Sequence, residues 1–238
     1  MTRARRFLAP FNYYGGKSKL ARLYPPPRHR LIVEPFAGAA AYAYRWADAR
    51  DVWVNDLDPY VAATWRFLTS PDAARWADAL APAIEPGATI DDVAPAGAPL
   101  GLRQWLAYAC FSGANPAKLH WHVTAFGAAR WTSAAAKLRV VAPRVRHWHV
   151  TQLPYDQLDA DVDATWFVDP PYAVNVGYYR GHGYRVQFTD HAVLGARCRD
   201  LAAAGHQVVA CDAVGATYLP FRPLHRIRSY AGPAPTTE

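Results

Sequence analysis

Residues 31–38, Leu-Ile-Val-Glu-Pro-Phe-Ala-Gly, decide the fold of this 238-residue chain. The first four are a short apolar run ending in an acid, a pattern typical of a buried strand. Pro35 to Gly38 form a tight turn, and the residues near 39–49, rich in Ala, Tyr and Trp, predict a helix after it. Strand, tight turn and helix in this order are the first half of a nucleotide-binding α/β unit.

A second unit follows directly. The run Val52–Val54 predicts a strand that ends in Asn55-Asp56. Asp58-Pro59 then opens a helix, because Asp is a favoured N-cap and Pro suits the first helical position. Strands that alternate with helices in this way predict an α/β fold with a mostly parallel, twisted sheet flanked by helices.

The second half of the chain continues this alternation. A helix is predicted from Asp190 to Ala204, with Thr189 as its N-cap and Gly205 at its C-terminal stop position. Apolar runs predict strands at 146–151, 165–168 and 207–211, and a final strand or hairpin at 224–230.

Residues 70–139 interrupt the pattern. Their first part is rich in Pro, Ala, Gly and Asp, and their second part combines a short helix with aromatic, His- and Gly-containing turns. We therefore expect an insert of helices and loops on a core domain made of residues 1–69 and 140–238.

Charge and apolar content limit the class of protein. The formal net charge of +7 favours a polyanionic partner, either a nucleic acid or an acidic membrane surface. No stretch approaches the ~20 apolar residues that span a bilayer, and the N-terminus lacks the apolar run of a secretory signal. We expect a cytoplasmic protein without a membrane partner. Cys110, Cys198 and Cys211 are too sparse to indicate a disulfide framework or a structural zinc site.

Residues 169–172, Asp-Pro-Pro-Tyr, form the motif with the most chemistry. They follow a predicted strand, and prolines end the pairing there, so the motif lies at the carboxyl edge of the sheet, where α/β folds bind ligands. The motif offers a carboxylate, a carbonyl kept out of helix pairing and an aromatic face. An exocyclic amine on a flat ring needs two acceptors and a stacking platform. The motif therefore indicates an amino-group site, although Pro-Pro after a strand is also an ordinary loop start.

Two acids mark a candidate ligand site in the first half. Glu34 stands before a turn that exposes backbone amides, where an acid repels phosphate and suits a cationic or hydroxyl-bearing ligand. A buried strand-to-helix turn is the alternative. Asp56 stands 22 residues later, close to the spacing at which dinucleotide-binding folds place an acid on ribose hydroxyls. Asp58 is better explained as a helix cap.

Four motifs, in order, resemble those of the Dam-type (alpha-group) DNA adenine N6-methyltransferases. They are Tyr13-Tyr14-Gly15-Gly16-Lys17, Glu34-Pro35-Phe36-Ala37-Gly38, Asn55-Asp56 and Asp169-Pro170-Pro171-Tyr172. The resemblance implies a Rossmann-like S-adenosylmethionine-dependent methyltransferase fold whose insert recognises the target. It further implies methyl transfer from S-adenosylmethionine to the amine of a flipped adenine, site-specifically and without a metal.

The resemblance also assigns roles to residues. The catalytic residues that it implies are Asp169, Pro170, Pro171 and Tyr172. The cofactor-binding residues that it implies are Tyr13, Tyr14, Gly15, Gly16, Lys17, Glu34, Phe36, Ala37, Gly38, Asp56, Leu57, Asp156 and Asp169. Two features depart from the family: Ala40 stands where a second glycine is usual, and the insert lacks the hairpin pattern associated with GATC recognition.

Double-stranded DNA is the partner that this resemblance implies, together with a cognate restriction endonuclease in some systems, and the chain is expected to act as a monomer. The candidate DNA-binding residues are Lys118, His120, His122, Arg130, Arg180 and Arg185, each of which has ordinary surface charge as its alternative. His120 and His122, like His147 and His149, lack a third ligand at metal-binding spacing. The tryptophans, Trp105, Trp121 and Trp131 among them, are expected to pack in the core or the insert.

Three other functions remain open from the residues. The same fold could act on RNA adenine or on the N4 amine of DNA cytosine. A catalytically silent DNA-binding or anti-restriction protein is a third reading, for which Ala40 leaves room. A nicotinamide-dependent oxidoreductase is disfavoured, because no Gly-x-Gly-x-x-Gly follows the first strand.

Overall fold

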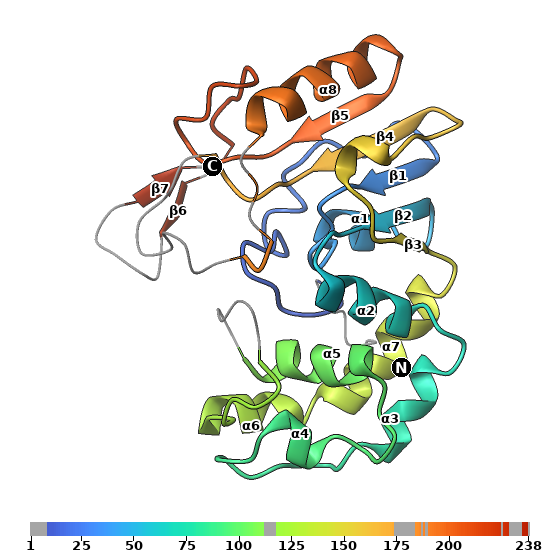
Figure 1. The fold of residues 1–238 in the computed structure, drawn as a ribbon, viewed down its shortest axis with the longest axis vertical. Coiled ribbons are helices and arrows are strands. Elements are labelled where there is room, and N and C mark those ends of the chain that lie inside the picture. The colour runs from blue at the N-terminus through green and yellow to red at the C-terminus, as the bar shows by residue number, and fades with distance from the viewer. Residues whose placement is uncertain are drawn as a thin grey trace, which may run out of the picture.

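The computed structural model describes residues 9–111, 118–173, 184–186, 188 and 190–224, and the backbone of 226–228 and 235–237. Its centre is a five-stranded parallel sheet with the strand order β3-β2-β1-β4-β5, as Figure 1 shows. The strands of this sheet are β1 (Leu31–Glu34), β2 (Asp51–Asn55), β3 (His149–Thr151), β4 (Ala164–Val168) and β5 (Gln207–Ala210). The predicted α/β fold with a parallel sheet flanked by helices is confirmed, and it is Rossmann-like in character.

The strand order reverses at β1. Leu31 pairs with Asp51 of β2 on one side and with Ala164 of β4 on the other, and both pairings are parallel. The chain leaves β1 and β4 in different directions, so a crevice forms beyond their carboxyl ends. The motifs at residues 34–38 and 169–172 both begin at this point of the sheet.

Both faces of the sheet are buried, because successive side chains of a strand point to opposite sides. Ile32 and Phe167 belong to the larger core, and Val33 and Trp166 belong to a smaller core beneath the last helix. The helices that flank the sheet are α1 (Ala41–Arg45), α2 (Pro59–Leu68) and α8 (His191–Ala203), whereas α7 (Ala134–Val145) packs mainly on other helices and precedes β3.

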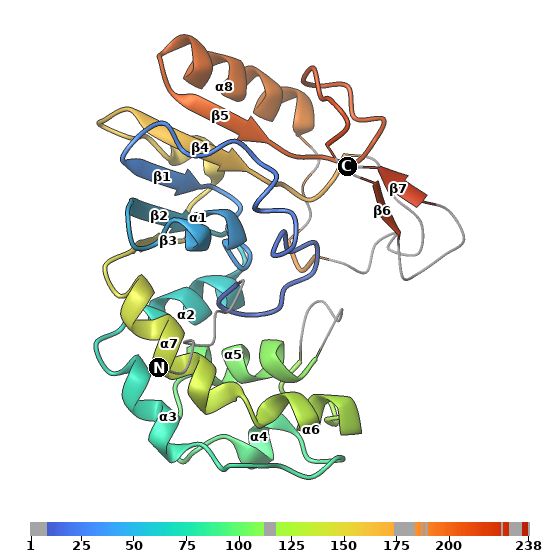
Figure 2. The same ribbon diagram turned by 180° about the vertical axis from the view of Figure 1, so that it is seen from behind.

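Residues 70–139 form a helical layer at one end of the molecule. Figures 1 and 2 show this layer beyond α2, with α7 as part of it and α8 at the opposite end of the molecule. Helix α5 lies directly on α2, and a Cβ at Gly101 would overlap the carbonyl oxygen of Ala63. The predicted boundary at 139/140 falls inside α7. The remaining helices of the insert are η1 (Ala73–Arg75), α3 (Trp76–Ala79), α4 (Ile90–Val93), α5 (Leu100–Cys110) and α6 (Ala125–Trp131).

Local signals placed several element ends correctly. Asp58 caps α2, with its Oδ1 accepting from the amide of Tyr60 at 2.9 Å. Gly205 ends α8 with φ of 100°. Helix α8 begins at His191 with Asp190 as its N-cap, whereas the predicted cap Thr189 lies outside the described residues.

Other boundaries were wrong. The helix predicted near 39–49 is only the five-residue α1. The strand predicted from Arg146 begins at His149, because Arg146 still has helical dihedral angles (φ −55°, ψ −31°) at the end of α7. The final hairpin consists of β6 (Arg226–Arg228) and β7 (Pro235–Thr237), which pair antiparallel. Within the described part of the chain, no helix combines the length and apolarity needed to cross a membrane.

Candidate active site

A cavity of about 310 Å³ lies at the carboxyl edge of the sheet, where the strand order reverses. Its walls come from residues 13–17, the turn after β1, the residues after β2 and β4, and the segment before α8. Twelve of the thirteen predicted cofactor-binding residues line it: Tyr13, Gly15, Gly16, Lys17, Glu34, Phe36, Ala37, Gly38, Asp56, Leu57, Asp156 and Asp169.

The turn after β1 brings backbone atoms close to the cavity. Gly38 has φ of 45°, in the left-handed region that favours glycine. A Cβ at Gly38 would lie 2.7 Å from Cδ1 of Tyr13, so the Tyr13 ring occupies the space where a side chain would stand. Ala40, the departure noted above, also has positive φ (44°), and no other non-glycine in the described residues does. The backbone therefore keeps the conformation expected of glycine although residue 40 is alanine.

Asn55 joins the ends of three strands. Its Nδ2 donates to the carbonyl oxygens of Pro35 and Leu153, both at 3.0 Å. Its Oδ1 accepts from Thr151 Oγ1 at 2.8 Å and from the amide of Leu153 at 2.9 Å. The side chain is 1% exposed and makes four hydrogen bonds, so it is a structural tie beneath the cavity floor rather than a ligand.

Asp56 stands where the loop after β2 meets the turn after β1. Its Oδ2 accepts from the amide of Gly38 and its Oδ1 from the amide of Asp58, both at 2.9 Å. Burial raises the pKa of Asp56 to about 7, although these two amide bonds favour the charged form. A carboxylate can accept about four hydrogen bonds, so Asp56 retains capacity for hydroxyl groups of a ligand in the cavity.

Glu34 lines the cavity, and its carboxylate is hydrogen-bonded to the backbone of α1. Its Oε1 accepts from the amide of Ala43 at 2.7 Å, in the first turn of α1. Ala40, at the N-cap position, has no side-chain acceptor, so Glu34 takes that role. Glu34 is 2% exposed, and burial, with the nearby Asp169 carboxylate, raises its pKa well above the usual range. A cationic ligand beside it would favour its ionised form.

The carboxylate of Asp169 is paired with a buried ammonium group. Lys17 Nζ donates to Asp169 Oδ1 and to the carbonyl oxygen of Gly15, both at 2.9 Å. The side chains of Lys17 and Asp169 are 4% and 17% exposed. The same Nζ lies 4.8 Å from the centroid of the Tyr172 ring. One lysine from the N-terminal segment thus contacts both ends of the Asp-Pro-Pro-Tyr motif.

Two side chains make hydrogen bonds to the backbone of the loop after β4. The carbonyl oxygen of Pro171 accepts from His191 Nε2 at 2.7 Å, at the start of α8. The amide of Ala173 donates to the carboxylate of Asp212, which is 7% exposed and follows β5. The sequence analysis missed Asp212; its position two residues beyond β5, at the same edge of the sheet, was the available signal.

The outer wall is aromatic. Phe188 packs against Phe36 (centroids 5.2 Å apart) and Tyr155 (5.5 Å). Tyr184 packs edge-on against Tyr14 at 5.2 Å. The sequence analysis gave no site role to Tyr155, Tyr184 or Phe188, because these side chains come together only in the fold.

The predicted DNA-binding residue Arg185 also lines this cavity. Its guanidinium carbon lies 3.9 Å from the centroid of the Tyr60 ring, and its Nε is 3.5 Å from Asp58 Oδ2. Arg185 therefore packs at the base of α2. Arg180 lies outside the described residues.

The titratable side chains of the cavity wall are mostly acidic. Among the residues that the structure describes, the cations of the wall are Lys17 and Arg185, which pair with Asp169 and Asp58 respectively. The acids that line the cavity are Glu34, Asp56, Asp58, Asp156, Asp169 and Asp190. An acidic cavity in a chain of net charge +7 favours a cationic or neutral ligand over a phosphate-bearing one.

Of the predicted catalytic and cofactor-binding residues, three do not line the cavity. Tyr14 stands behind Tyr184, and Pro170 and Tyr172 lie beyond the cavity wall, on the loop that starts with Asp169. Within that loop only Asp169 and Pro171 face the cavity. The carbonyl and the ring that the motif offers to an amine are therefore at the margin of the cavity and not inside it.

The remaining predicted DNA-binding residues lie together on the insert. His120 and His122 line a separate groove, and Lys118 and Arg130 flank aromatic rings beside it. Across the described residues, no three His, Cys, Asp or Glu side chains are grouped closely enough to hold a metal ion.

No protein-family model matches the chain, and no curated protein matches it significantly.

Proposed function

We propose that the protein is an S-adenosylmethionine-dependent DNA adenine N6-methyltransferase. The observation that carries the proposal is an acidic cavity directly adjoining the Asp-Pro-Pro-Tyr loop, with Asp169 shared by both. The acids favour a cationic ligand, and the loop offers acceptors for an amino group at the cavity margin. A DNA substrate agrees with the net charge of +7.

The cavity residues fit S-adenosylmethionine on three observations. Asp56, at the end of β2, can accept ribose hydroxyls in addition to its two amide bonds. Glu34 and Asp156 add negative charge for a sulfonium amino acid, and the Phe36 ring offers an apolar surface. The turn at Gly38 brings the backbone to the cavity without a side chain. When bound, the cofactor supplies an already activated methyl group.

The chain's own residues would prepare the amine that receives the methyl group. The carboxylate of Asp169 and the carbonyl of Pro170 accept its two hydrogens, which points the nitrogen lone pair away from them. Tyr172 provides the stacking face for a base that has left the duplex. Lys17 is a positioning residue, because its bonds to Asp169 and Gly15 tie the carboxylate to the N-terminal segment. The acceleration comes from positioning and from carboxylate stabilisation of charge on nitrogen.

The test is methyl transfer with the purified full chain. Labelled S-adenosylmethionine and genomic DNA should yield N6-methyl-2′-deoxyadenosine in the digested product, and mapping the methylated positions identifies the target sequence. Asp169→Ala should abolish transfer. Asp51→Ala is the matched control, since this exposed aspartate lies at the opposite end of the sheet, where its carboxylate pairs with Arg30.

The product decides among the rival activities. N4-methylcytidine in DNA, or methylation of RNA in preference to DNA, would replace adenine or DNA as the substrate. Calorimetry that detects no binding of S-adenosylmethionine, or full activity of Asp169→Ala, would refute the proposal.

A further inference from the structure

The loop after β4, residues 169–173, has few backbone donors. Pro170 and Pro171 have no amide hydrogen, so neither can join a ladder with a neighbouring strand. A loop of this composition depends on side chains from other elements for a defined conformation. On one side Lys17 donates to Asp169. Two further side chains, to which the proposed function gives no role, contact the backbone of the loop from another side.

Asp212 is placed beside the loop by the pairing of β4 with β5. Val168 pairs with Ala210, and the amide of Cys211 continues this pairing by donating to the carbonyl oxygen of Val168 at 2.8 Å. Both carboxylate oxygens of Asp212 lie 3.2 Å from the amide nitrogen of Ala173, and the side chain is buried. A buried carboxylate that accepts from an amide makes a charge-assisted hydrogen bond, so this contact fixes the end of the loop.

His191, the first residue of α8, contacts the middle of the loop. Its Nε2 lies 2.7 Å from the carbonyl oxygen of Pro171. A carbonyl oxygen only accepts, so Nε2 carries the hydrogen and donates it. The imidazole packs against the ring of Phe188, at a centroid distance of 4.8 Å, and against that of Tyr218, at 5.3 Å. These neighbours restrict rotation of the imidazole, so the direction of the donor is set by packing.

Tyr218 connects both side chains to the packing of α8. Its ring contacts His191, and burial together with the nearby Asp212 carboxylate raises the pKa of its phenol well above the usual range. The carbonyl oxygen of Tyr218 accepts from Arg199 Nη1 at 3.1 Å, and a Cβ at Gly195 would lie 2.7 Å from that oxygen. The segment after β5 is therefore packed closely on α8.

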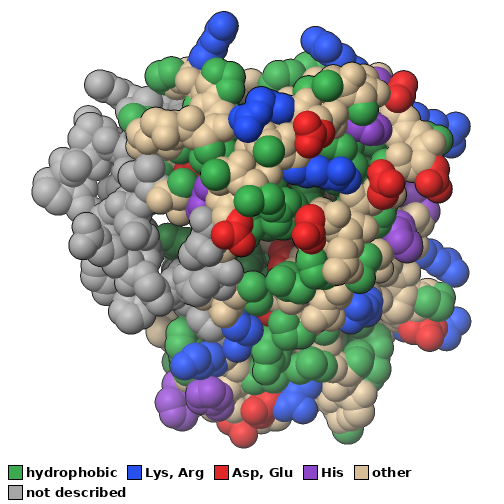
Figure 3. Space-filling view, turned by 45° about the horizontal axis from the view of Figure 1, so that its top comes forward, with side chains coloured by type: hydrophobic (Ala, Val, Ile, Leu, Met, Phe, Trp, Pro, Cys, Tyr) green, Lys and Arg blue, Asp and Glu red, His purple; other side chains and the backbone are tan. Residues whose placement is uncertain are grey.

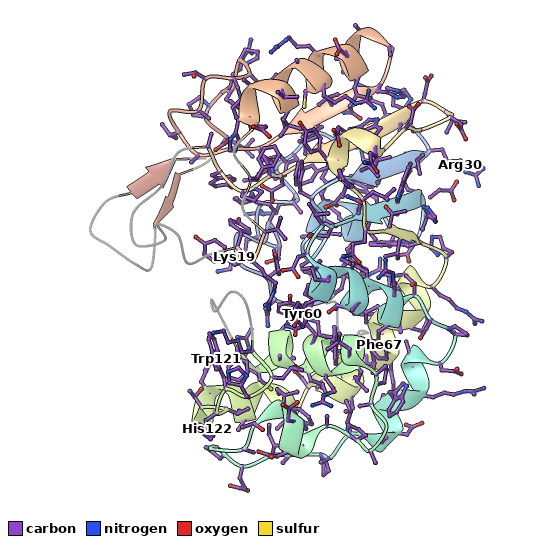
Figure 4. All side chains as sticks on the ribbon, in the orientation of Figure 1. Lys19, Arg30, Tyr60, Phe67, Trp121 and His122 are labelled. Carbon is purple, nitrogen blue, oxygen red and sulfur yellow. The ribbon has the colours of Figure 1, made fainter. Side chains whose placement is uncertain are left out.

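The loop is bonded from two sides. Figure 4 shows the N-terminal segment, marked by Lys19, between the end of β4 and the insert. Figure 1 shows β5 and α8 beyond β4, toward the other end of the molecule. Figure 3 shows acidic and hydrophobic side chains around a hollow on one face, in agreement with the acidic lining of the cavity that the loop borders. A shift of the loop toward either end would strain the bonds on the opposite side.

The bonded residues alternate with those that offer the carbonyl and the ring. Side chains from outside the loop bond Asp169, Pro171 and Ala173. Pro170 and Tyr172 stand between them. When the residues on both sides of a peptide group are fixed, the directions of its carbonyl and of the adjacent side chain are fixed as well. The three bonds therefore orient the acceptor and the stacking face that the proposed reaction needs.

We infer that Asp212 and His191 are positioning residues of the proposed reaction. Each acts through the backbone of the loop, Asp212 at Ala173 and His191 at Pro171, and not on the amine itself. The inference rests on the proposed function for the reaction, and on the hydrogen bonds alone for the conformation of the loop. Loss of either bond leaves the cofactor cavity in place but lets the loop move relative to the target amine. The rate of methyl transfer therefore falls while cofactor affinity stays.

The test compares variants of the full chain that remove or conserve each bond. Asp212→Ala and His191→Phe remove it, and kcat should fall about tenfold to a hundredfold, with affinity for S-adenosylhomocysteine within about twofold of the wild type. Asp212→Asn keeps an acceptor and His191→Gln keeps an amide donor, so both should retain most of the wild-type kcat. Asp200→Ala and Val193→Ala, at exposed positions of α8, are the controls for loss of a carboxylate and of an apolar side chain.

Hydrogen exchange followed by mass spectrometry measures the bond of Asp212 without any ligand. In peptides that contain residues 169–173, the Ala173 amide should exchange at least about tenfold faster in Asp212→Ala than in the wild type, and close to the wild-type rate in Asp212→Asn. Unchanged exchange in Asp212→Ala would overturn the inference.

The kinetic outcomes separate positioning from a merely structural role. Wild-type kcat in both Asp212→Ala and His191→Phe, or a loss of kcat that Asp212→Asn and His191→Gln do not rescue, would also overturn the inference. A wild-type chain that shows the expected exchange but neither binds the cofactor nor transfers methyl would overturn the proposed function alone.

Discussion

Replacing Gly38 by alanine tests the geometry of the turn after β1. The substitution places a Cβ 2.7 Å from Tyr13 Cδ1 in a backbone whose φ is 45°. Left-handed backbone costs an alanine about 1–2 kcal/mol, and overpacking typically adds about 1–3 kcal/mol. Reduced freedom of the unfolded chain returns about 0.4–1 kcal/mol. We expect Gly38→Ala to lower the free energy of unfolding by about 2–4 kcal/mol.

Gly97→Ala is the matched control for this prediction. Gly97 also has positive φ (73°), but a Cβ there would have no atom within 4 Å. Its substitution therefore carries only the backbone cost, about 1 kcal/mol. Urea unfolding followed by tryptophan fluorescence measures both variants, and the difference between them isolates the overlap with Tyr13.

A double variant checks the same contact from the other side. In the Tyr13→Ala background the ring is gone, and Gly38→Ala should then cost only as much as Gly97→Ala does. If Gly38→Ala and Gly97→Ala destabilise the wild type equally, within about 0.5 kcal/mol, the Tyr13 ring does not fill the space assigned to it.

Three further predictions concern the cavity. Burial raises the pKa of Asp56 to about 7, so its carboxylate form, to which the proposed function assigns the ribose hydroxyls, is lost as pH falls below 7. Affinity for S-adenosylhomocysteine should therefore weaken from pH 8 to pH 6, and binding should release protons. Calorimetry in buffers of different ionisation enthalpy measures this, and an equal pH dependence in Asp56→Asn would contradict it. Asn55→Ala removes four hydrogen bonds beneath the cavity and should lower the free energy of unfolding by about 2–4 kcal/mol in urea titrations. A change below about 0.5 kcal/mol would contradict the structural role of Asn55 in joining the strand ends. Lys17→Met should lower kcat roughly tenfold to a hundredfold with little change in cofactor affinity, because the substitution frees the Asp169 carboxylate to reorient. Weaker cofactor binding at unchanged kcat would instead assign Lys17 to cofactor binding.

The sheet could be predicted from the sequence because its signals are local. Each core strand is a short apolar run that stops at a polar residue, as at Glu34, Asn55 and Asp169. In a parallel sheet those stopping points meet at one edge, so motifs far apart in sequence were expected to come together. In the structure, residues of three of these segments line one cavity.

The misses come from contacts that no local pattern records. Phe188 and Tyr155 reach the cavity only because the segments on either side of β4 fold onto the turn after β1. The bond from the amide of Ala43 to Glu34 was not expected, because it depends on the lack of a side-chain cap at Ala40. Arg146 stayed helical because it continues the last turn of α7, whose packing on other helices overrides the weak strand pattern of this segment.

The Tyr13 ring has a consequence for how such a sequence can evolve. The ring fills the space above Gly38 and packs edge-on against Tyr108 of the insert helix α5, with centroids 5.7 Å apart. A lineage can gain a side chain at position 38 only after position 13 has lost its ring, and that loss leaves Tyr108 stacked on Phe11 but without its edge-on contact to Tyr13. We therefore expect positions 13, 38 and 108 to covary among homologues, so that inheritance of the insert is bound to inheritance of the N-terminal segment.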